Sequence, residues 1–253
     1  MQALVQDILS GRQPVVSYAH PIVGLKSGML EAEEILTRYR DGTGQVRTVG
    51  SLLVDQSIAR DQRARIDLLC IETIFSALAR TPVTDHLIFV NLDPLTLECE
   101  EFWDRIRPWL WDLAIPPHRI VMEITEAHAL HDLDQMGVYA QRLRDLELRI
   151  AVDDLGSGVA SLSHMARLAP DFVKVDQSLV KDCHRRPYQA ALLHALSVFA
   201  ETMGVGLIAE GIETPEELQC VVDSGVPWGQ GFIFGAPTPL RLPADAANPG
   251  PLA

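Results

Sequence analysis

Short apolar runs in this chain repeatedly end at a carboxylate or an amide side chain. The runs and the residues that end them are 87–90 with Asn91, 120–122 with Glu123, 150–152 with Asp153 and Asp154, and 207–209 with Glu210. Runs of this length between helical patterns are typical of buried parallel strands, and ligands bind at the carboxyl ends of such strands. Carboxylates gathered at one place repel one another and resist desolvation, so the pattern predicts a bound multivalent cation.

Length and charge narrow the class of protein. A chain of 253 residues that is 47% hydrophobic is long enough for a single α/β barrel, so one domain is favoured over two. The formal net charge of −13 argues against a protein that binds nucleic-acid polymers or an anionic membrane surface. It leaves room for a small phosphate ligand that is held through metal ions.

The cysteines and the N-terminal residues indicate a protein of the cytoplasm. Cys70, Cys99, Cys183 and Cys220 are far apart in the sequence and form no C-x-x-C pair, so we expect reduced thiols in the core. No basic segment followed by an apolar one opens the chain, and no apolar stretch approaches the ~18 to 20 residues that span a bilayer. These features predict no membrane segment and a cytoplasmic location.

Apolar patterns alternate between strands and helices along the chain. Helices are predicted for residues 51–58, 65–80, 101–113, 130–146, 161–168, 187–203 and 215–224. Beside the runs given above, strands are predicted for residues 15–18, 29–32, 172–175 and 231–234, with 22–25 as a hairpin arm. This alternation favours a closed (β/α)₈ TIM-like barrel with an irregular first strand or hairpin. We expect residues 1–14 to form a lead-in helix, 15–240 the barrel domain and 241–253 a flexible tail.

An ordered set of motifs carries a resemblance to a known family. The motifs are PIV at 21–23, EILTR at 34–38, VNL at 90–92, EITE at 123–126, DDLGSG at 153–158, KVD at 174–176, AEGIET at 209–214 and QGFIFG at 230–235. Together they resemble the EAL-domain proteins, bacterial phosphodiesterases that hydrolyse cyclic di-GMP to linear 5′-pGpG and so lower this second messenger. One motif alone would be weak evidence, but the resemblance covers residues 15–240.

The resemblance implies a two-metal site at the mouth of the barrel. The implied ligands of two Mg²⁺ or Mn²⁺ ions are Glu34, Asn91, Glu123, Asp153, Asp154, Glu210 and Gln230. All of them offer oxygen, which these hard cations prefer. In the family, Asp153 has the bridging position, and a water between the ions attacks phosphorus in line. Lys174 matches the catalytic lysine, and near cations its pKa should fall, which suits it to orient that water or accept its proton. Glu34, Asp153 and Glu210 complete the implied catalytic set.

The same resemblance implies substrate contacts and a regulatory loop. Arg38 is implied as a phosphate contact, because its planar guanidinium suits a phosphodiester better than a lysine would. Asp176, Glu213 and Gln230 are implied on the substrate side of the site. Glu126 resembles the glutamate that anchors the loop after the aspartate pair. In the family this loop lies at a dimer interface, so the resemblance implies a homodimer.

The chain departs from the family pattern in two places that bear on regulation and recognition. Leu155, Val159 and Ala160 replace a Phe, a Tyr and a Ser in the loop after the aspartate pair, which leaves less aromatic area to hold this loop. His20 replaces a glutamine that commonly precedes the PIV motif, so contacts to the substrate are expected to differ there. No sensor, receiver or GGDEF-type pattern is present, so a sensor or regulatory domain is expected outside this chain.

Taken singly, several of these residues have a structural alternative. Asp153 and Asp154 would serve as a helix N-cap pair, and Glu213 would favour a helix dipole. Lys174 is harder to explain in this way, because a lysine within an apolar strand must reach solvent or an anion. Two functional alternatives also stay open. One is a catalytically silent EAL receptor that binds cyclic di-GMP and relays the signal to a partner, and the other is a two-metal hydrolase of a different phosphodiester.

Overall fold

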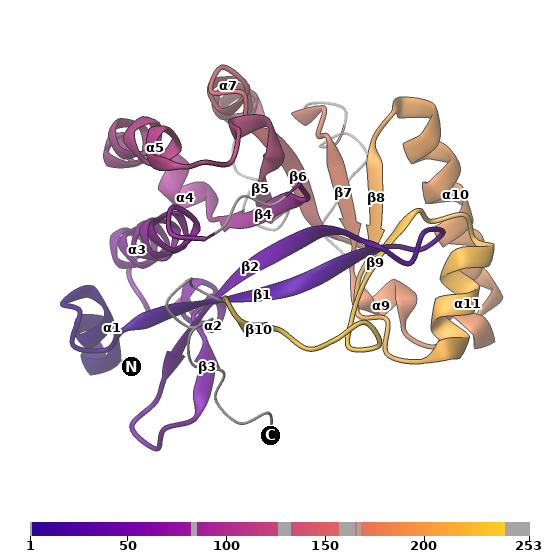
Figure 1. Cartoon of the computed structure of the whole chain (residues 1–253), viewed down its shortest axis with the longest axis horizontal. Coiled ribbons are helices and arrows are strands. Elements are labelled where there is room, and N and C mark those ends of the chain that lie inside the picture. The colour runs from indigo at the N-terminus through magenta and orange to yellow at the C-terminus, as the bar shows by residue number, and fades with distance from the viewer. Residues whose placement is uncertain (1, 82–84, 126–132, 157–164, 166–167, 241–253) are drawn as a thin grey trace.

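Eight strands close into a barrel in the computed structural model, which describes residues 2–81, 85–125, 133–156, 165 and 168–240. The barrel strands are β1 (Val15–Gly24), β2 (Leu30–Arg40), β4 (Leu87–Leu92), β5 (Ile120–Thr125), β6 (Arg149–Leu155), β7 (Phe172–Val175), β8 (Gly206–Ala209) and β9 (Trp228–Gln230). β1 runs antiparallel to both of its neighbours, β2 and β9, whereas the other neighbouring pairs are parallel. The predicted (β/α)₈ barrel with an irregular first hairpin is therefore confirmed (Figure 1).

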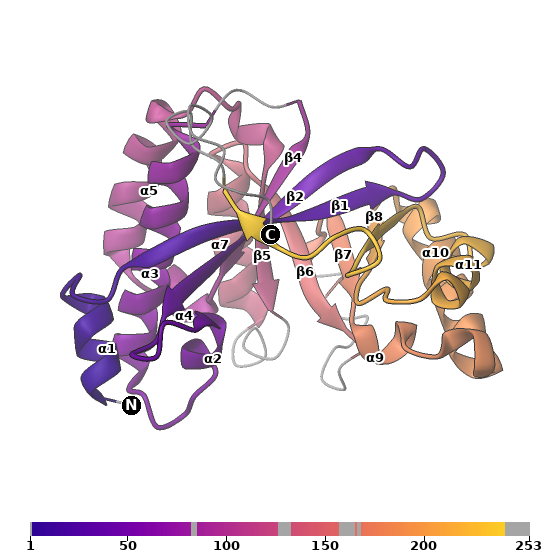
Figure 2. The ribbon, with the colours of Figure 1, turned by 60° about the horizontal axis from the view of Figure 1, so that its bottom comes forward.

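Helices cover the outside of the barrel, and two short strands extend its sheet. β3 (Val46–Thr48) pairs with β2, and β10 (Thr238–Pro239) pairs with β1. The helices are α1 (Gln2–Leu9), α2 (Gly50–Leu53), α3 (Arg60–Leu78), α4 (Pro94–Leu97), α5 (Glu100–Asp112), α7 (Leu133–Arg144), α9 (Gln177–Val180), α10 (Pro187–Met203) and α11 (Pro215–Asp223), with 3₁₀ turns η1 (Pro117–Arg119) and η2 (Cys183–Arg185). Figure 2 shows α3, α5 and α7 on one side of the barrel, and α10 and α11 on the other.

The first hairpin is longer than the sequence pattern predicts. Strands are expected at residues 15–18 and 29–32, with a hairpin arm at 22–25. The structure instead has one continuous strand β1 from Val15 to Gly24, and β2 continues to Arg40, with a register from Val15 opposite Tyr39 to Val23 opposite Leu30. Side chains alternate along a strand, so residues four apart on β2 point to the same face. The long second arm therefore holds both charged ends of the EILTR motif, residues 34 and 38, on one strand.

The helix predicted for residues 51–58 ends early. α2 stops at Leu53, because the Ser57 N–H donates to Asp55 Oδ1 at 2.8 Å and forms a turn in which the side chain replaces a backbone acceptor. The next helix, α3, begins at Arg60. The helix predicted for residues 161–168 lies largely outside the described residues.

The strand predicted for residues 231–234 is wrong. This segment is a turn, in which the Phe234 N–H donates to the Gly231 carbonyl oxygen at 3.0 Å, and the strand lies earlier, at β9. A Cβ at Gly231 would lie 2.2 Å from the carbonyl oxygen of Ile212. Only glycine permits this close approach of two backbone segments, so the chain turns directly after Gln230.

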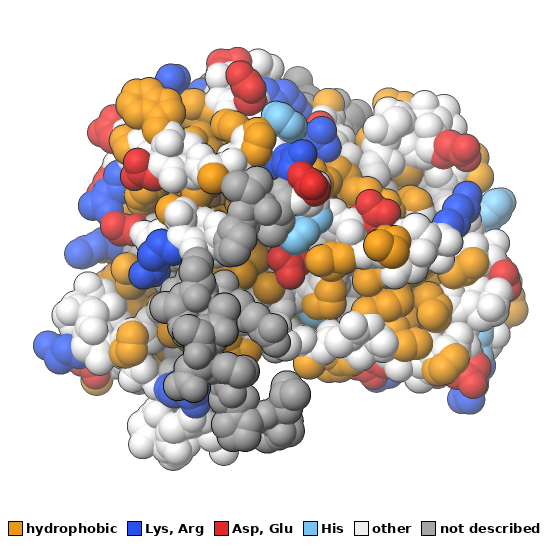
Figure 3. Space-filling view, in the orientation of Figure 1, with side chains coloured by type: hydrophobic (Ala, Val, Ile, Leu, Met, Phe, Trp, Pro, Cys, Tyr) orange, Lys and Arg blue, Asp and Glu red, His pale blue; other side chains and the backbone are white. Residues whose placement is uncertain are grey.

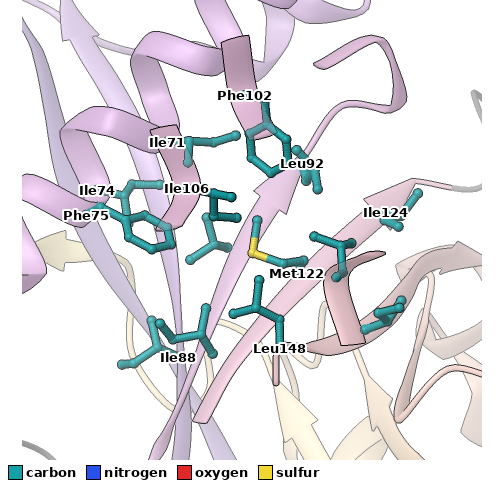
Figure 4. Packing of buried hydrophobic residues seen from close by; sticks show 14 of the residues in the cluster. Ile71, Ile74, Phe75, Ile88, Leu92, Phe102, Ile106, Met122, Ile124 and Leu148 are labelled. Atoms are coloured by element: carbon teal, nitrogen blue, oxygen red, sulfur yellow. The ribbon is translucent and has the colours of Figure 1, made fainter. Parts of the chain in front are cut away.

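The largest apolar cluster packs α3 and α5 against strands β4 and β5. Figure 4 shows Ile74 and Phe75 of α3 and Ile106 of α5 pointing toward Met122 of β5. All four side chains are at most 2% exposed. Full burial of a side chain of this size stabilises a fold by about 1.5–3 kcal/mol. The cluster thus fixes the two strands that carry Asn91 and Glu123.

The surface of the barrel is mixed in character. Figure 3 shows charged side chains of both signs over the whole face, and a gathering of apolar side chains in its lower right-hand part, over α9 and α11. The net negative charge therefore forms no continuous acidic surface on this face. Within the described ranges, each helix is too short or too polar to cross a bilayer.

Candidate functional site

Two successive layers of side chains fill the inside of the barrel. The lower one, which we call the floor layer, is apolar and consists of Ile22, Ala32, Phe89, Val121, Ala151, Phe172, Ile208 and Trp228. The upper one, which we call the site layer, lies two residues away on each strand and consists of His20, Glu34, Asn91, Glu123, Asp153, Lys174, Glu210 and Gln230. Because side chains alternate along a strand, a step of two residues keeps a side chain inside the barrel and moves it one layer toward the mouth.

Asp153 and Asp154 are consecutive residues of β6, so a regular strand would point them to opposite faces. The pairing of β6 with β7 shifts register between Val152 and Leu155, and Asp154 has a φ of 62°, in the left-handed region that is rare for side chains other than glycine. The Asp154 N–H donates to Asp153 Oδ1 at 2.9 Å. This irregularity brings both carboxylates to one place, where an oxygen of each and an oxygen of Glu210 lie within 4.8 Å of one another.

Lys174 lies at the centre of the site layer and is 1% exposed. Its Nζ is 2.6 Å from Glu210 Oε1, 3.0 Å from Glu123 Oε1, 3.4 Å from Glu34 Oε2 and 3.6 Å from Asp153 Oδ1. It also donates a hydrogen bond to Glu123 Oε2 at 3.1 Å. A buried ammonium group requires anionic partners, and these four carboxylates explain how an otherwise apolar strand accommodates a lysine.

Two amide side chains hold Glu34 in place. Asn91 Nδ2 donates to Glu34 Oε1 at 2.8 Å, and Gln230 Nε2 donates to Glu34 Oε2 at 2.8 Å. The same Gln230 nitrogen lies 2.9 Å from His20 Nδ1. An amide nitrogen only donates, so His20 Nδ1 must be the acceptor in this contact. These hydrogen bonds join β1, β2, β4 and β9, on both sides of the antiparallel strand that closes the barrel.

Burial and mutual repulsion oppose ionisation of most of the carboxylates. Burial raises the pKa of Glu123 well above its ordinary value, and the neighbouring carboxylates add to the rise although Lys174 opposes it. Burial likewise raises the pKa of Asp153, and it raises the pKa of Glu210 to about 8. For Asp154, burial and the charge of Asp153 raise the pKa to about 6.

Glu34 and Lys174 have pKa shifts that favour their charged forms. Burial would raise the pKa of Glu34, but Lys174 and the two amide donors outweigh this and lower it. Burial would lower the pKa of Lys174, but the surrounding carboxylates raise it well above its ordinary value. The expected fall of the lysine pKa depends on cations in the site. The side chains alone have the opposite effect, so that expectation stays a prediction for the metal-loaded protein.

The charge of the site layer fits a site for divalent cations. Four carboxylates lie within ion-pair distance of one ammonium group, which leaves a formal charge of −3 when all are ionised. Buried negative charge of this size must be neutralised by protons or by cations. The donor atoms near Asp153, Asp154 and Glu210 are carboxylate oxygens close enough to share an ion. Hard cations such as Mg²⁺ and Mn²⁺ prefer this donor set.

Two cavities meet at Glu34. One, of about 820 Å³, is lined by Glu34 together with Arg38 and Asn91. The other, of about 630 Å³, is lined by Glu34 together with His20, Asp154, Asp176, Glu210, Glu213, Gln230 and Phe232. Of the side chains assigned to metal or to substrate, all except Glu123 and Asp153 line at least one of these two cavities.

The structure also shows how the outer residues of the site are held. The Asp176 side chain caps α9 by accepting a hydrogen bond from the Ser178 N–H at 3.0 Å. The Glu213 N–H donates to Glu217 Oε2 at 3.0 Å, which leaves its side chain at the cavity wall. Arg38 is half-buried and donates to the carbonyl oxygen of Thr37 at 3.0 Å. Glu126, the predicted loop anchor, lies outside the described residues, as do Val159 and Ala160.

One buried acid beside the site is absent from the sequence-based predictions. Asp67 of α3 lines the larger cavity, and its Oδ2 accepts a hydrogen bond from the Asp93 N–H at 3.0 Å. Burial, and then the charge of Asp93, raise the pKa of Asp67 to about 7, although a hydrogen bond from Thr96 opposes the rise. The available signal was an aspartate placed directly between Ile66 and Leu68 in an apolar helix pattern.

The sequence is similar to a known domain family and to several curated proteins. The family model described as EAL domain matches residues 2–237. An uncharacterised protein of Azorhizobium caulinodans is 29% identical over 98% of this chain and 34% of its own length. A Borreliella burgdorferi protein named cyclic di-GMP phosphodiesterase PdeA is 27% identical over 88% of this chain and 33% of its own length. The chain therefore spans about a third of the length of these curated relatives.

Solved structures with the same fold include complexes with a cyclic dinucleotide. The BlrP1 protein of Klebsiella pneumoniae, solved with calcium and cyclic di-GMP, has 28% identity and a TM-score of 0.80 over 91% of this chain and 57% of its own chain. The YkuI protein of Bacillus subtilis, solved with cyclic di-GMP and calcium, has 26% identity and a TM-score of 0.81 over 94% of this chain and 59% of its own.

Proposed function

The chain belongs to the EAL domain family, and on that premise we propose that it hydrolyses cyclic di-GMP to linear 5′-pGpG with the help of two Mg²⁺ or Mn²⁺ ions. The observation that carries the proposal is the site layer, in which one buried lysine is surrounded by four carboxylates at the open end of the barrel. An EAL receptor without activity would need neither the lysine nor the complete set of acids.

Cations are proposed to bind among the oxygen donors of the site layer. The proposed ligands are Glu34, Asn91, Glu123, Asp153, Asp154, Glu210 and Gln230. Bound there, divalent cations would supply Lewis-acid stabilisation of the charge that develops on the phosphoryl oxygens and would make a bound water more acidic. The fit rests on the excess negative charge of these side chains and on the proximity of Asp153, Asp154 and Glu210.

The residues of the chain then have separate roles in the proposed reaction. Water adds to phosphorus, one P–O3′ ester bond breaks, and the departing ribose oxygen gains a proton. Lys174 Nζ, held among carboxylates at 2.6–3.6 Å, orients the attacking water and exchanges a proton with it. Asn91 and Gln230 hold Glu34 so that its carboxylate cannot rotate. Arg38, whose fork-shaped guanidinium matches phosphate oxygens, contacts the nucleotide from the larger cavity.

The shape of the site supports a substrate with two nucleoside halves. Cavities of about 820 Å³ and 630 Å³ adjoin at Glu34, so a dinucleotide would place its phosphodiester near the acids and one base on each side. Relatives named cyclic di-GMP phosphodiesterases and structures that contain cyclic di-GMP support the same substrate. Homodimerisation, a regulatory domain outside this chain and a cytoplasmic location stay predictions from the family resemblance and the composition.

A direct assay tests the proposal. Purified protein incubated with cyclic di-GMP and Mg²⁺ or Mn²⁺ should form pGpG, which chromatography separates from the substrate, and chelation of the cations by EDTA should stop the reaction. No turnover with either ion, in protein that circular dichroism shows to be folded, would refute the proposed hydrolysis. Tight nucleotide binding by calorimetry in the same sample would then identify a receptor. Competition with other cyclic and linear dinucleotides defines the substrate class.

A further inference from the structure

Two cysteines that are far apart in the sequence meet on the outer side of the barrel. Cys183 lies in η2 and Cys220 lies in α11. Helix α11 packs against η2, and the Cys220 thiol is one of the groups that perturb the Cys183 thiol. Cys183 Sγ is also 4.0 Å from the carbonyl oxygen of Glu217, one helical turn before Cys220. The fold has therefore placed two free thiols side by side, although no spacing in the sequence indicates a pair.

The two thiols differ in access to solvent. Cys183 is 1% exposed, whereas Cys220 is half-buried and lines an open surface groove with His184 and His194. Burial, and then the neighbouring Cys220 thiol, raise the pKa of Cys183 to about 12. A thiol reagent from solvent therefore reaches Cys220 first, and the buried thiol follows as its neighbour.

The segments that carry these cysteines are already fixed against each other. Glu217 Oε1 accepts a hydrogen bond from the Asp182 N–H at 3.0 Å, next to Cys183 in the chain. Its Oε2 accepts hydrogen bonds from the N–H groups of Glu213 at 3.0 Å and of Thr214 at 3.1 Å. A bond between the two sulfurs therefore joins segments that one carboxylate already holds together, and loss of the disulfide would not separate them.

We propose that Cys183 and Cys220 form a reversible dithiol–disulfide pair, in which Cys220 reacts first with a soluble disulfide such as glutathione disulfide. The Cys220 thiolate attacks one sulfur of glutathione disulfide, and one glutathione thiolate leaves. Cys183 gives up its proton and attacks the Cys220 sulfur of this mixed disulfide, and the second glutathione thiolate leaves and is protonated. Two protein thiols are oxidised, and one glutathione disulfide is reduced to two glutathione thiols.

The bond would connect the wall of the site to the outer helices. The chain passes from Lys174 through Asp176 and α9 to Cys183, and from Glu210 through Glu213 to Cys220. Asp176, Glu210 and Glu213 line the smaller cavity. A disulfide at this position would limit local opening of both segments, and we expect slower hydrogen exchange of α9 and of the residues between β8 and α11.

Titration with glutathione disulfide tests the pair directly. After treatment at pH 8, removal of reagent and unfolding in guanidinium, the wild-type protein should keep two of its four thiols in a reaction with Ellman's reagent. Trypsin cleaves after Lys181 and Arg185 and thus separates the two cysteines, so mass spectrometry should find a peptide of residues 182–185 linked to the peptide that contains Cys220. The Tm should rise by several degrees and return to its original value in dithiothreitol.

Single substitutions give matched controls. Cys183→Ser should retain glutathione on Cys220, and Cys220→Ser should form neither the mixed disulfide nor the link. Cys99→Ser, which removes another half-buried thiol, should form the same link as the wild type and keep one of its three thiols. Four remaining thiols in the treated wild type, or glutathione that stays on Cys220 without a link to Cys183, would overturn the proposal. The test requires no nucleotide, so its outcome is independent of the proposed hydrolysis.

Discussion

The floor layer and the site layer of the barrel are two residues apart on each strand, yet their physical characters are opposite. In the floor layer, the Phe172 ring lies edge-on to Phe89, with centroids 5.2 Å apart, and stacks on Trp228 at 5.3 Å. In the site layer, Lys174 is surrounded by acids. Apolar burial stabilises the fold, whereas buried carboxylates destabilise it unless they are paired. A distance of two residues along each strand thus separates the side chains that stabilise the barrel from those that form the proposed active site.

The largest expected effect is on the site layer. Lys174→Ala should lower kcat for cyclic di-GMP hydrolysis by about 10³-fold, a size typical of a lost proton-transfer or charge-stabilising group. Binding of Mn²⁺ and nucleotide should remain measurable by calorimetry. Steady-state kinetics provides the measurement, with Lys181→Ala, an exposed lysine, as the control. Normal turnover in Lys174→Ala would exclude the lysine from the mechanism.

A substitution in the floor layer should lower the stability of the protein and leave the catalytic rate unchanged. Phe89→Ala removes a side chain that is 0% exposed. It should lower the free energy of unfolding by about 3–5 kcal/mol through lost burial and a cavity. Urea denaturation measures this, and Phe199→Ala, at a side chain that is 37% exposed, should cost much less. A Phe89→Ala protein of normal stability but without activity would contradict the division between the layers.

Asp67 differs from the acids of the site layer, because it is buried but does not interact with Lys174. Burial raises the pKa of Asp67 to about 7 in the folded protein, from a value near 4 in the unfolded chain. Between pH 4 and pH 7, Asp67 is therefore ionised in the unfolded chain but still protonated in the folded protein. Stability should therefore fall as pH rises through this window, by roughly 1–4 kcal/mol, and level off above pH 7. Urea midpoints from pH 4 to pH 8 should show this fall in the wild type and a smaller one in Asp67→Asn. Identical pH profiles would remove Asp67 as the cause.

The smallest expected effect is the stabilisation of the protein by cations, which should differ between variants of the two layers. Mn²⁺ at about 100 times its Kd should raise the free energy of unfolding by about 2.7 kcal/mol, because it binds the folded protein only. Phe89→Ala should keep this increase, whereas Glu123→Gln should lose most of it. Glu201→Gln, at an exposed glutamate, provides the control. Differential scanning fluorimetry with and without EDTA measures the shift, and an equal response in all three variants would place the cations elsewhere.

The barrel was predicted from local patterns in the sequence, whereas the site residues were named through the family resemblance and their roles stay predictions. Apolar runs that end at an acid, such as residues 120–122 before Glu123, set strand positions and the layer that each acid enters. The missed features depend on contacts between distant segments. The φ of Asp154 follows from the shifted register between β6 and β7. The position of Cys183 beside α11, the helix that carries Cys220, arises from packing of η2 on α11, and no spacing within the chain encodes it.

The antiparallel strand β1 closes the barrel by pairing with β2 on one side and with β9 on the other. As a result, His20 near the start of the chain and Gln230 near its end share a hydrogen bond. During synthesis on the ribosome, the acids of β2, β5 and β6 emerge long before the strand that completes the ring. A growing chain should therefore be unable to complete the site layer until residue 230 has left the exit tunnel, so the site assembles in one late step.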